Sequence, residues 1–297
     1  MLGVVNLDKP VGPTSHDMVG MMRRLTGTRR IGHAGTLDPL ASGVLPILVG
    51  AATRFSAELT GGSKRYDAVI RLGARSATDD AEGPIEPGDG PLPDEDAVRA
   101  TLVGFVGTFD QLPPAFSARK VGGRTAYRAA RAGHPIALLP RPVTIHTLEL
   151  VGFVRGSEGA DVRVDLCCGA GTYVRSLARD LGERLHCGGY LRALRRTAAA
   201  GLTVDTAVTP EHLEALAAAG RLGDAILLVG GLLPLPRVTI GRDAAIAFRN
   251  GSARPLSEAA AADGRAAVFE GEELIGIGSV TSNTLQPEKV LPREAVG

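Results

Sequence analysis

The chain has 297 residues, of which 44% are hydrophobic, 22% charged and 4% aromatic, and its formal net charge is +1. This composition is typical of a folded globular protein and excludes wholesale disorder, and the length suits one large domain or a large domain with a small one. Basic residues predominate in segments 1–75 and 101–141 and acidic residues in 76–100 and 201–297, a pattern typical either of a polyanion-binding surface or of solvated faces.

Cysteine content and hydropathy restrict where the protein works. Cys167, Cys168 and Cys187 form neither a disulfide framework nor a zinc-binding spacing, which favours a reducing compartment. The first ten residues lack the basic start of a signal peptide, and prolines and glycines interrupt the longest uncharged run, residues 39–53. We therefore expect a cytoplasmic protein that has no membrane span.

The first fifty residues predict one strand and one helix. Residues 4–7 have the apolar character of a short strand, and Thr14 or Ser15 can cap a helix after it. The apolar positions of that helix fall on one face: Met18, Val19, Met22 and Leu25. Residues 32–50 are rich in glycine, proline and small residues, so we expect that segment to be mostly irregular.

The middle of the chain alternates strands with helices. Residues 66–72 alternate as a half-buried strand does, and the acidic, glycine- and proline-rich residues 78–93 predict a loop or linker. A helix is expected from about Asp94, and strands over residues 144–151 and 162–168. The apolar stripe of the helix consists of Val98, Leu102 and Val106.

Two further helices follow. The first has a strong apolar stripe at helical spacing: Val174, Leu177, Ala178, Leu181 and Leu185. The second opens at Thr209, a capping residue, with Pro210 at its first position. The apolar run 225–236 ends in two prolines and marks a domain boundary.

The last sixty residues predict a small β-rich module. A helix over residues 242–250 should stop at Gly251, and strands over 266–269 and 274–280 follow, joined by an acidic turn. Strands and helices interleave irregularly along the whole chain, which favours an α+β fold over a doubly wound sheet.

Residues 32–43, GHAGTLDPLASG, form the segment richest in chemically active groups. Its glycines permit close backbone approach, and Asp38 offers a carboxylate that can serve as a nucleophile or general base. From the spacing alone, Asp38-Pro39 can equally begin an ordinary turn, and His33 can be a structural hydrogen-bonding residue.

A second candidate segment is residues 171–175, GTYVR. Arg175 falls in the first turn of its helix, where a cation opposes the helix dipole, so an anion is expected nearby unless the side chain is simply solvated. Tyr66 follows two basic residues and would point its ring to the apolar face of its strand, as a core tyrosine also does.

Several motifs in chain order resemble the bacterial tRNA pseudouridine synthase B family, which modifies uridine 55 in the T arm. The first are residues 7–15 (LDKPVGPTS), residues 32–47 (GHAGTLDPLASGVLPI) and Lys64-Arg65-Tyr66. The resemblance continues through residues 117–120 and 122–123, Tyr127, Arg131, residues 171–175 and residues 194–196. It covers residues 3–200 closely, and it removes the interpretation of Asp38 as a turn residue only.

The resemblance implies a function for particular residues. Asp38 would be the catalytic aspartate, Arg175 its ion-pair partner and Tyr66 the aromatic residue at the target base. Other residues would contact the flipped nucleotide or shape the floor of the site: His33, Tyr173, Leu194 and Lys9. No metal and no cofactor are implied.

The resemblance also implies an architecture and a partner. Residues 1–235 would form the catalytic domain, including an RNA-binding insertion, on a mixed, largely antiparallel sheet with flanking helices. Residues 236–297 would form a small PUA-like RNA-binding β-barrel. The partner would be the T-arm stem-loop of tRNA, bound by a monomer that needs neither a protein partner nor a guide RNA.

Two other functions compete with uridine isomerisation. A non-enzymatic RNA-binding or tRNA-folding protein could use the same scaffold, although such a protein would not need Asp38 and Arg175. A nucleobase hydrolase would also place a carboxylate near C1′, but it would activate a water and release uracil.

Overall fold

The computed structural model describes residues 2–117, 120–121, 124–125, 136–256 and 262–292. The chain forms two compact units. Unit 1 comprises Met1–Leu37, Val44–Gly62 and Ala200–Gly297, and unit 2 comprises Asp38–Gly43 and Ser63–Ala199. Among the helices of the described residues, none is long and apolar enough to cross a membrane.

Unit 2 is built on a mixed, largely antiparallel sheet. Its antiparallel strands run in the order β12 (Gly189–Ala199), β4 (Lys64–Leu72), β11 (Ala160–Cys168), β10 (Arg141–Arg155) and β7 (Gly107–Gln111). The first three residues of β3 (Ala41–Val49) pair in parallel with β12. The predicted α+β class is therefore confirmed, and strands were correctly expected at β4, β10 and β11.

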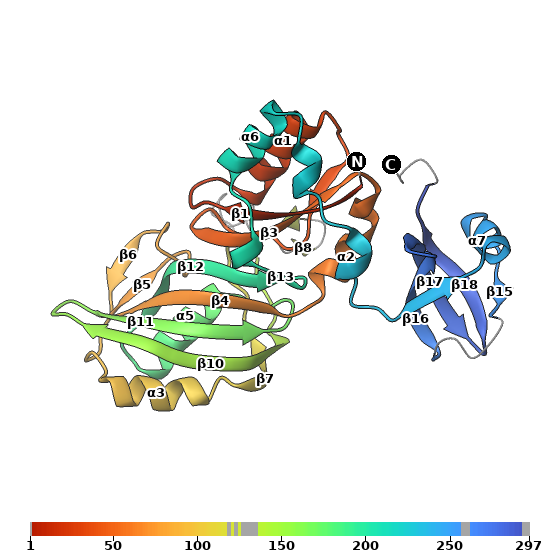
Figure 1. Cartoon of the computed structure of the whole chain (residues 1–297). Helices are drawn as coiled ribbons and strands as arrows, with labels where there is room; N and C mark the ends of the chain where they lie inside the picture. The colour runs from red at the N-terminus through yellow and green to blue at the C-terminus, as the bar shows by residue number, and fades with distance from the viewer. Residues whose placement is uncertain (1, 118–119, 122–123, 126–135, 257–261, 293–297) are drawn as a thin grey trace. The chain divides into compact units, whose positions relative to one another are not determined.

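Two helices cover one face of this sheet. Helix α5 (Val174–Arg184) packs on β12 and β4, and α3 (Glu95–Val103) packs on β10 and against α5, as can be followed in Figure 1. Alternate residues of β4 are buried because every second side chain of a strand points to the same face. The predicted start of α3 is confirmed, since the side chain of Asp94 accepts a hydrogen bond from the N–H of Ala97. Val106, however, lies beyond the helix end and is exposed.

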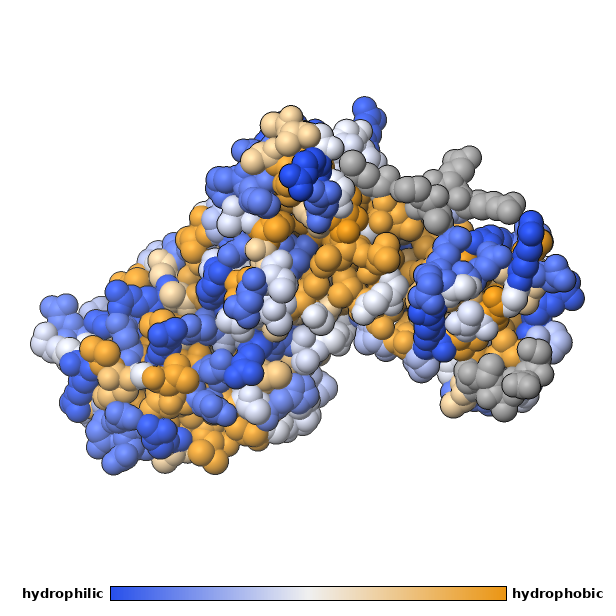
Figure 2. Space-filling model, viewed as in Figure 1, coloured by the Kyte–Doolittle hydropathy of each residue, from blue (hydrophilic) through white to orange (hydrophobic). Residues whose placement is uncertain are grey.

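The other face of the sheet carries charged pairs between neighbouring strands. Arg163 on β11 pairs with Asp67 on β4 at 2.5 Å, and Arg65 on β4 pairs with Asp165 on β11 at 2.8 Å. Figure 2 shows hydrophilic residues interspersed with apolar ones over this part of the molecule. One face of the sheet is thus covered by helices and the other carries charged residues, which explains why apolar and polar residues alternate along β4 in the sequence.

Short hairpins complete unit 2. Strand β5 (Ala74–Ser76) pairs with β6 (Ile85–Pro87), and β8 (Lys120–Val121) pairs with β9 (Arg124–Thr125). The interpretation of residues 78–93 as a loop is correct apart from β6.

The N-terminal part of unit 1 contains β1 (Gly3–Lys9) and β2 (Ile31–His33), both paired with β3. Helix α1 (Ser15–Thr26) begins after Thr14, whose hydroxyl accepts a hydrogen bond from the N–H of Asp17, and buries Met18, Val19 and Met22 as predicted. Helix α6 (Pro210–Ala218) is capped by Thr209, also as predicted. The remaining short elements here are η1 (Gly50–Phe55), α2 (Ser56–Thr60), β13 (Leu202–Thr203), η2 (Val204–Thr206), η3 (Leu222–Ala225) and η4 (Val229–Leu232).

The prediction that residues 32–50 are mostly irregular is wrong. Strand β3 occupies nine of these residues, and β2 reaches His33, so only residues 34–40 lack regular structure. Strand β3 is buried along nearly its whole length, and a strand buried on both faces shows no alternation of apolar and polar residues. Pro46 made this strand still harder to predict from the sequence, because proline is rare inside a strand.

The C-terminal part of unit 1 forms a separate five-stranded sheet, consistent with a PUA-like domain. Its strands run in the order β14 (Arg237–Ile240), β16 (Gly264–Glu270), β17 (Glu273–Thr281), β18 (Thr284–Val290) and β15 (Arg254–Pro255). Helix α7 (Arg242–Arg249) packs against this sheet and places Phe248 in its core. The predicted helix and both predicted strands are confirmed, whereas the independence of residues 236–297 stays a prediction.

Candidate active site

Asp38 lies on a short loop whose ends are fixed by backbone contacts. The N–H of Ala41 donates to the carbonyl of Asp38 at 3.0 Å, which closes a tight turn around Pro39. Gly43, two residues after the turn and already in β3, has a φ of +100°, and a Cβ atom there would lie 2.2 Å from the carbonyl oxygen of Arg196. Only glycine fits this position, so the loop can lie directly against β12.

The loop is also held on its N-terminal side, within unit 1. Ser15, the first residue of α1, is buried, and its hydroxyl bonds both main-chain groups of Leu37, the residue before Asp38. The hydroxyl accepts from the N–H of Leu37 at 2.8 Å and donates to its carbonyl at 2.9 Å. The main chain entering Asp38 therefore has a fixed position.

Arg175 brings a buried guanidinium to the Asp38 carboxylate. The Arg175 residue is 6% exposed, and its Nη2 lies 3.0 Å from Oδ2 of Asp38, whose side chain is 39% exposed. The guanidinium also donates to the carbonyls of Thr78, at 3.3 Å, and Phe116, at 3.0 Å. Asp38 is thus oriented by a buried cation while its carboxylate stays open to a ligand.

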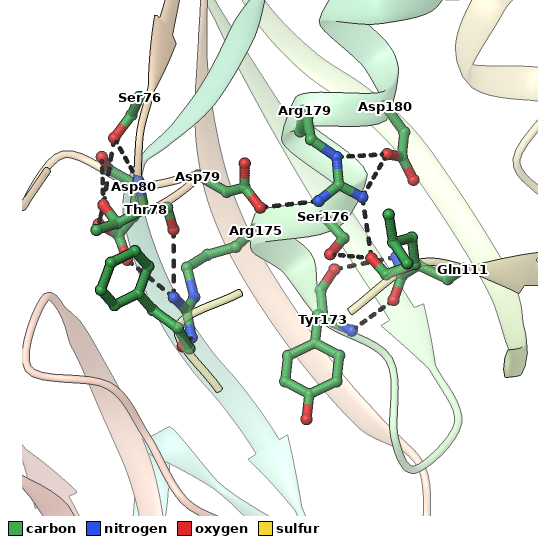
Figure 3. Close-up of polar contacts among 12 residues, drawn as sticks. Ser76, Thr78, Asp79, Asp80, Gln111, Tyr173, Arg175, Ser176, Arg179 and Asp180 are labelled. Atoms are coloured by element: carbon green, nitrogen blue, oxygen red, sulfur yellow. Dashed lines mark hydrogen bonds and ion pairs between the residues drawn. The ribbon is translucent and has the colours of Figure 1, made fainter. Parts of the chain in front are cut away.

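Asp80 is a second carboxylate on the same guanidinium, and the sequence interpretation missed it. Its Oδ2 lies 3.4 Å from Nη1 of Arg175, and its Oδ1 accepts from the Thr78 hydroxyl and, at 3.0 Å, from the N–H of Glu82. Asp80 is 2% exposed and faces Arg175 as Figure 3 shows, so Arg175 joins this buried carboxylate to the accessible one of Asp38. No local signal distinguishes Asp80 from its acidic neighbours in the loop.

Tyr66 and Leu194 reach the same part of unit 2 through the sheet. Tyr66 on β4 is opposite Arg196 on β12, and Leu194 on β12 is opposite Ala41 of the loop. Burial raises the pKa of the Tyr66 phenol, and the Arg196 guanidinium, which donates it a hydrogen bond, opposes only part of that shift. The charge of Asp38 also raises this pKa, as the smallest of the contributions. The phenol is therefore protonated at neutral pH.

Tyr173 precedes α5 and is held by Gln111, the last residue of β7. Oε1 of Gln111 accepts from the Tyr173 N–H at 2.9 Å, and its Nε2 donates to the Tyr173 carbonyl at 3.1 Å. One helical turn after Arg175, Arg179 binds Asp79 at 2.9 Å and Asp180 at 2.8 Å. Burial raises the pKa of both these aspartates. Neither Gln111 nor Arg179 was predicted as part of the site.

His33 and Lys9 belong to unit 1. His33 ends β2 and is half-buried, and its carbonyl accepts a hydrogen bond from the Ser56 hydroxyl at 3.3 Å. Lys9 is fully buried, and its Nζ donates to the carbonyls of Pro10, at 2.8 Å, and Pro13, at 2.7 Å. Lys9 thus orders the turn that leads into α1, and a direct contact of either residue with RNA stays a prediction.

Some residues that carry the resemblance lie outside the described part of the chain, namely residues 118–119 and 122–123, Tyr127 and Arg131. Among the described residues, no group of three or more His, Cys, Asp or Glu side chains is placed to hold a metal ion. Burial raises the pKa of the Cys168 thiol to about 11, so this thiol is neutral and unreactive at physiological pH.

Two family models that match consecutive parts of the chain show the class of the protein, which is a pseudouridine synthase and hence an isomerase. Residues 23–174 match the N-terminal domain of TruB family pseudouridylate synthases, and residues 175–238 match the C-terminal domain of tRNA pseudouridylate synthase B. The chain belongs to the TruB family.

Curated relatives extend the similarity over most of the chain. A tRNA pseudouridine synthase B from Ralstonia nicotianae is 40% identical over 294 residues, which are 97% of this chain and 94% of that relative. One from Thermobifida fusca is 48% identical over 246 residues, 80% of this chain and 82% of that relative.

A solved structure shares the fold. The crystal structure of the archaeal box H/ACA sRNP Nop10-Cbf5 complex contains a chain with a TM-score of 0.73 and 27% identity. The match covers 99% of this chain and 87% of that chain.

Proposed function

We propose that this enzyme converts uridine 55 in the T arm of tRNA to pseudouridine, with Asp38 as the catalytic aspartate. The observation that carries the proposal is the 3.0 Å ion pair between the accessible Asp38 carboxylate and the buried Arg175 guanidinium. Two further observations support tRNA as the substrate: the curated relatives are named tRNA pseudouridine synthase B, and the motifs around Asp38 resemble that family over their full length.

The reaction needs an ionised carboxylate at the ribose. Isomerisation breaks the bond between N1 of uracil and C1′ and forms a bond between C5 and C1′. C5 loses its proton and N1 gains one, so the atoms balance and no electrons are transferred to another molecule. Asp38 can start this sequence either by attacking C1′ or by removing the C2′ proton.

Arg175 makes Asp38 suitable for either step. A guanidinium beside a carboxylate restricts the orientation of that carboxylate through charge-assisted hydrogen bonds. Arg175 is itself held by Asp80 and by the carbonyls of Thr78 and Phe116, so its guanidinium has partners besides Asp38. Preorganisation of this kind lowers the cost of reaching the transition state.

The target uridine must leave the stem-loop before Asp38 can reach its sugar. We propose that Tyr66 lies against the flipped base and that Tyr173, His33 and Leu194 contact the flipped nucleotide. Aromatic rings suit this purpose because every base has a face on which they can stack. Lys9 would act indirectly, by fixing the turn before α1, since its ammonium is buried.

The proposal includes a C-terminal RNA-binding module, a cytoplasmic location and a monomeric enzyme. Residues 236–297 would fold as a PUA-like module that extends the RNA contact beyond the T arm. The enzyme would work in the cytoplasm as a monomer, without a guide RNA or protein partner.

A single assay tests the reaction and the requirement for partners together. The purified full chain alone is incubated with a T-arm stem-loop, and pseudouridine is located by a base-specific chemical label, because the product has the mass of uridine. We expect label at position 55 with the wild type and none with Asp38→Asn. Release of free uracil would indicate a hydrolase, and binding without any product would indicate an RNA-binding protein; either result would contradict the proposal.

A further inference from the structure

Gln111 makes an unusual contact for a side chain in a strand, because it bonds both main-chain groups of a single distant residue. Its amide accepts from the N–H of Tyr173 at 2.9 Å and donates to the carbonyl of Tyr173 at 3.1 Å, across 62 positions of sequence. Gln111 is 1% exposed, so water does not compete for either bond. Figure 3 shows this two-point contact at the start of α5.

Tyr173 needs such a partner because of its place in the chain. It is the residue before the first turn of α5, has an extended backbone, and makes no capping bond with its own side chain. The backbone N–H groups at a helix start have no partner within the helix. The Tyr173 carbonyl already accepts from the N–H of Leu177 at 3.1 Å, whereas its N–H depends on Gln111.

The neighbouring Arg175 does not depend on Gln111 to the same degree. Its guanidinium has contacts to two carboxylates and two carbonyls, so its position is fixed several times over. Figure 3 shows the Tyr173 ring and the Arg175 guanidinium as two separate side chains near the start of α5, with no polar contact drawn between them. Loss of Gln111 should therefore displace the Tyr173 ring first and the Arg175 guanidinium little.

We propose that Gln111 is a positioning residue of the isomerisation, which fixes the main chain of Tyr173 so that its ring meets the target nucleotide in one orientation. This inference rests on the proposed function, because it gives Tyr173 a contact with the flipped nucleotide. Gln111 itself is buried beneath the helix start and acts only through Tyr173.

Ser176 offers a matched control at the same junction. Its hydroxyl, also fully buried, donates to the carbonyl of Leu112 at 2.8 Å and so ties α5 to the residue after Gln111. Ser176→Ala removes a buried hydrogen bond between the same two segments without touching the main chain of Tyr173. A purely structural effect on this junction should appear in both variants.

The test compares full-length wild type, Gln111→Ala and Ser176→Ala. Three quantities are measured: the single-turnover rate of pseudouridine formation at saturating enzyme, the Kd for tRNA and the melting temperature. We expect the rate of Gln111→Ala to fall by about tenfold or more while its Kd changes by less than about twofold. Ser176→Ala should keep its rate within about twofold, with a loss of melting temperature similar to that of Gln111→Ala.

A double-mutant cycle with Tyr173→Ala shows whether Gln111→Ala lowers the rate through the Tyr173 ring. If Gln111 acts through the Tyr173 ring, Gln111→Ala should change the rate by less than about twofold once that ring is absent. Should Gln111→Ala fail to fold, Gln111→Glu keeps the size and the acceptor but loses the donor, and the same cycle applies to it.

Two results would overturn the inference: equal rate losses in Gln111→Ala and Ser176→Ala, or the same loss for Gln111→Ala with and without the Tyr173 ring. Failure of the proposed function would look different, since the wild type would then form no pseudouridine.

Discussion

At the scale of single residues, the site depends on how one guanidinium is shared. Nη2 of Arg175 faces Asp38 and Nη1 faces Asp80, so a single planar group links a carboxylate that is open to a ligand with one that is sealed in the protein. Buried charges are tolerated only when they are paired and hydrogen-bonded, and Asp80 meets both conditions. The arrangement keeps the accessible carboxylate oriented without burying it.

Replacement of Asp38 should separate chemistry from binding. We expect Asp38→Asn to abolish pseudouridine formation, because the amide can neither attack C1′ nor remove a proton. The tRNA Kd should stay within about tenfold, or roughly 1.4 kcal/mol, of the wild-type value. Single-turnover rates and binding titrations on the same preparation test this, and a variant with near wild-type turnover would show that Asp38 is not the catalytic group.

Arg175→Lys should reduce activity far more than stability. A lysine keeps the charge, but one ammonium cannot present two separate nitrogens to Asp38 and Asp80 in the fixed plane of a guanidinium. Thermal melts and single-turnover rates measured side by side decide the question. Parallel losses in both would mean that Arg175 only supports the fold.

Asp80→Asn tests whether the buried carboxylate contributes through its charge. The amide oxygen can still accept from the Thr78 hydroxyl and the Glu82 N–H, while the ion pair with Arg175 is lost. We expect a slower single-turnover rate with an unchanged tRNA Kd, because Asp80 is too buried to touch RNA. Asp180→Asn, which alters a partner of Arg179 instead, is the control, and an equal rate loss in that variant would contradict a specific contribution from Asp80.

At the scale of elements, each flank of the turn that carries Asp38 is held within its own unit. Ser15 at the beginning of α1 bonds both main-chain groups of Leu37, and Gly43 lies against β12. Of the residues between Leu37 and Gly43, residues 38–40 lack regular structure, whereas Ala41 and Ser42 already belong to β3.

Ser15→Ala should loosen this loop. It leaves two buried main-chain groups of Leu37 without their partner, at a cost of about 1–3 kcal/mol of stability. We expect a larger loss of single-turnover rate than of tRNA affinity. Thr14→Ala, which removes the exposed cap of the same helix at about 0.5–2 kcal/mol, is the control, and it should keep the rate. Equal rate losses for the two variants would refute the anchoring of Asp38 through Ser15.

At the scale of the whole molecule, the C-terminal sheet has what an independent module requires. Strands β14 to β18 and α7 enclose a hydrophobic core of their own, which includes Val268, Ile275 and Phe248. Within unit 1, Arg265 and Lys289 of this sheet bind Glu58 of α2 at 2.7 and 2.8 Å. Removal of the module would expose Glu58 to water, which can solvate its charge.

Truncation after Leu235 should leave a folded enzyme with weaker tRNA binding. A module with its own core can be removed without unfolding the rest. The loss of affinity should be larger for full tRNA than for a T-arm stem-loop, yet modest, because the removed residues 236–297 carry 7 basic and 8 acidic residues. Titrations with both RNAs at two salt concentrations test this, and the salt dependence should change little if few phosphate contacts are lost. An insoluble truncation, or one with unchanged affinity for full tRNA, would refute the separate RNA-binding module.

The sequence by itself determined those features that depend on neighbouring residues along the chain. Helices α1, α5 and α6 were predicted from their apolar stripes or caps, and strand β4 from its alternation, because these signals are local. Asp38, Arg175 and Tyr66 were proposed as site residues because the motifs around them resemble a family over many consecutive residues.

Only the tertiary structure decided the features that depend on distant partners. The contribution of Asp80 to the site depends on its ion pair with Arg175, and that of Gln111 depends on its hydrogen bonds to Tyr173. No residue close to Asp80 or Gln111 in the sequence indicates these partners. Strand β3 was hidden for a related reason, since burial on both faces removes the alternation by which a strand is recognised. Long-range hydrogen bonds and ion pairs form when the chain folds, so their identity is a property of the fold and not of any local segment.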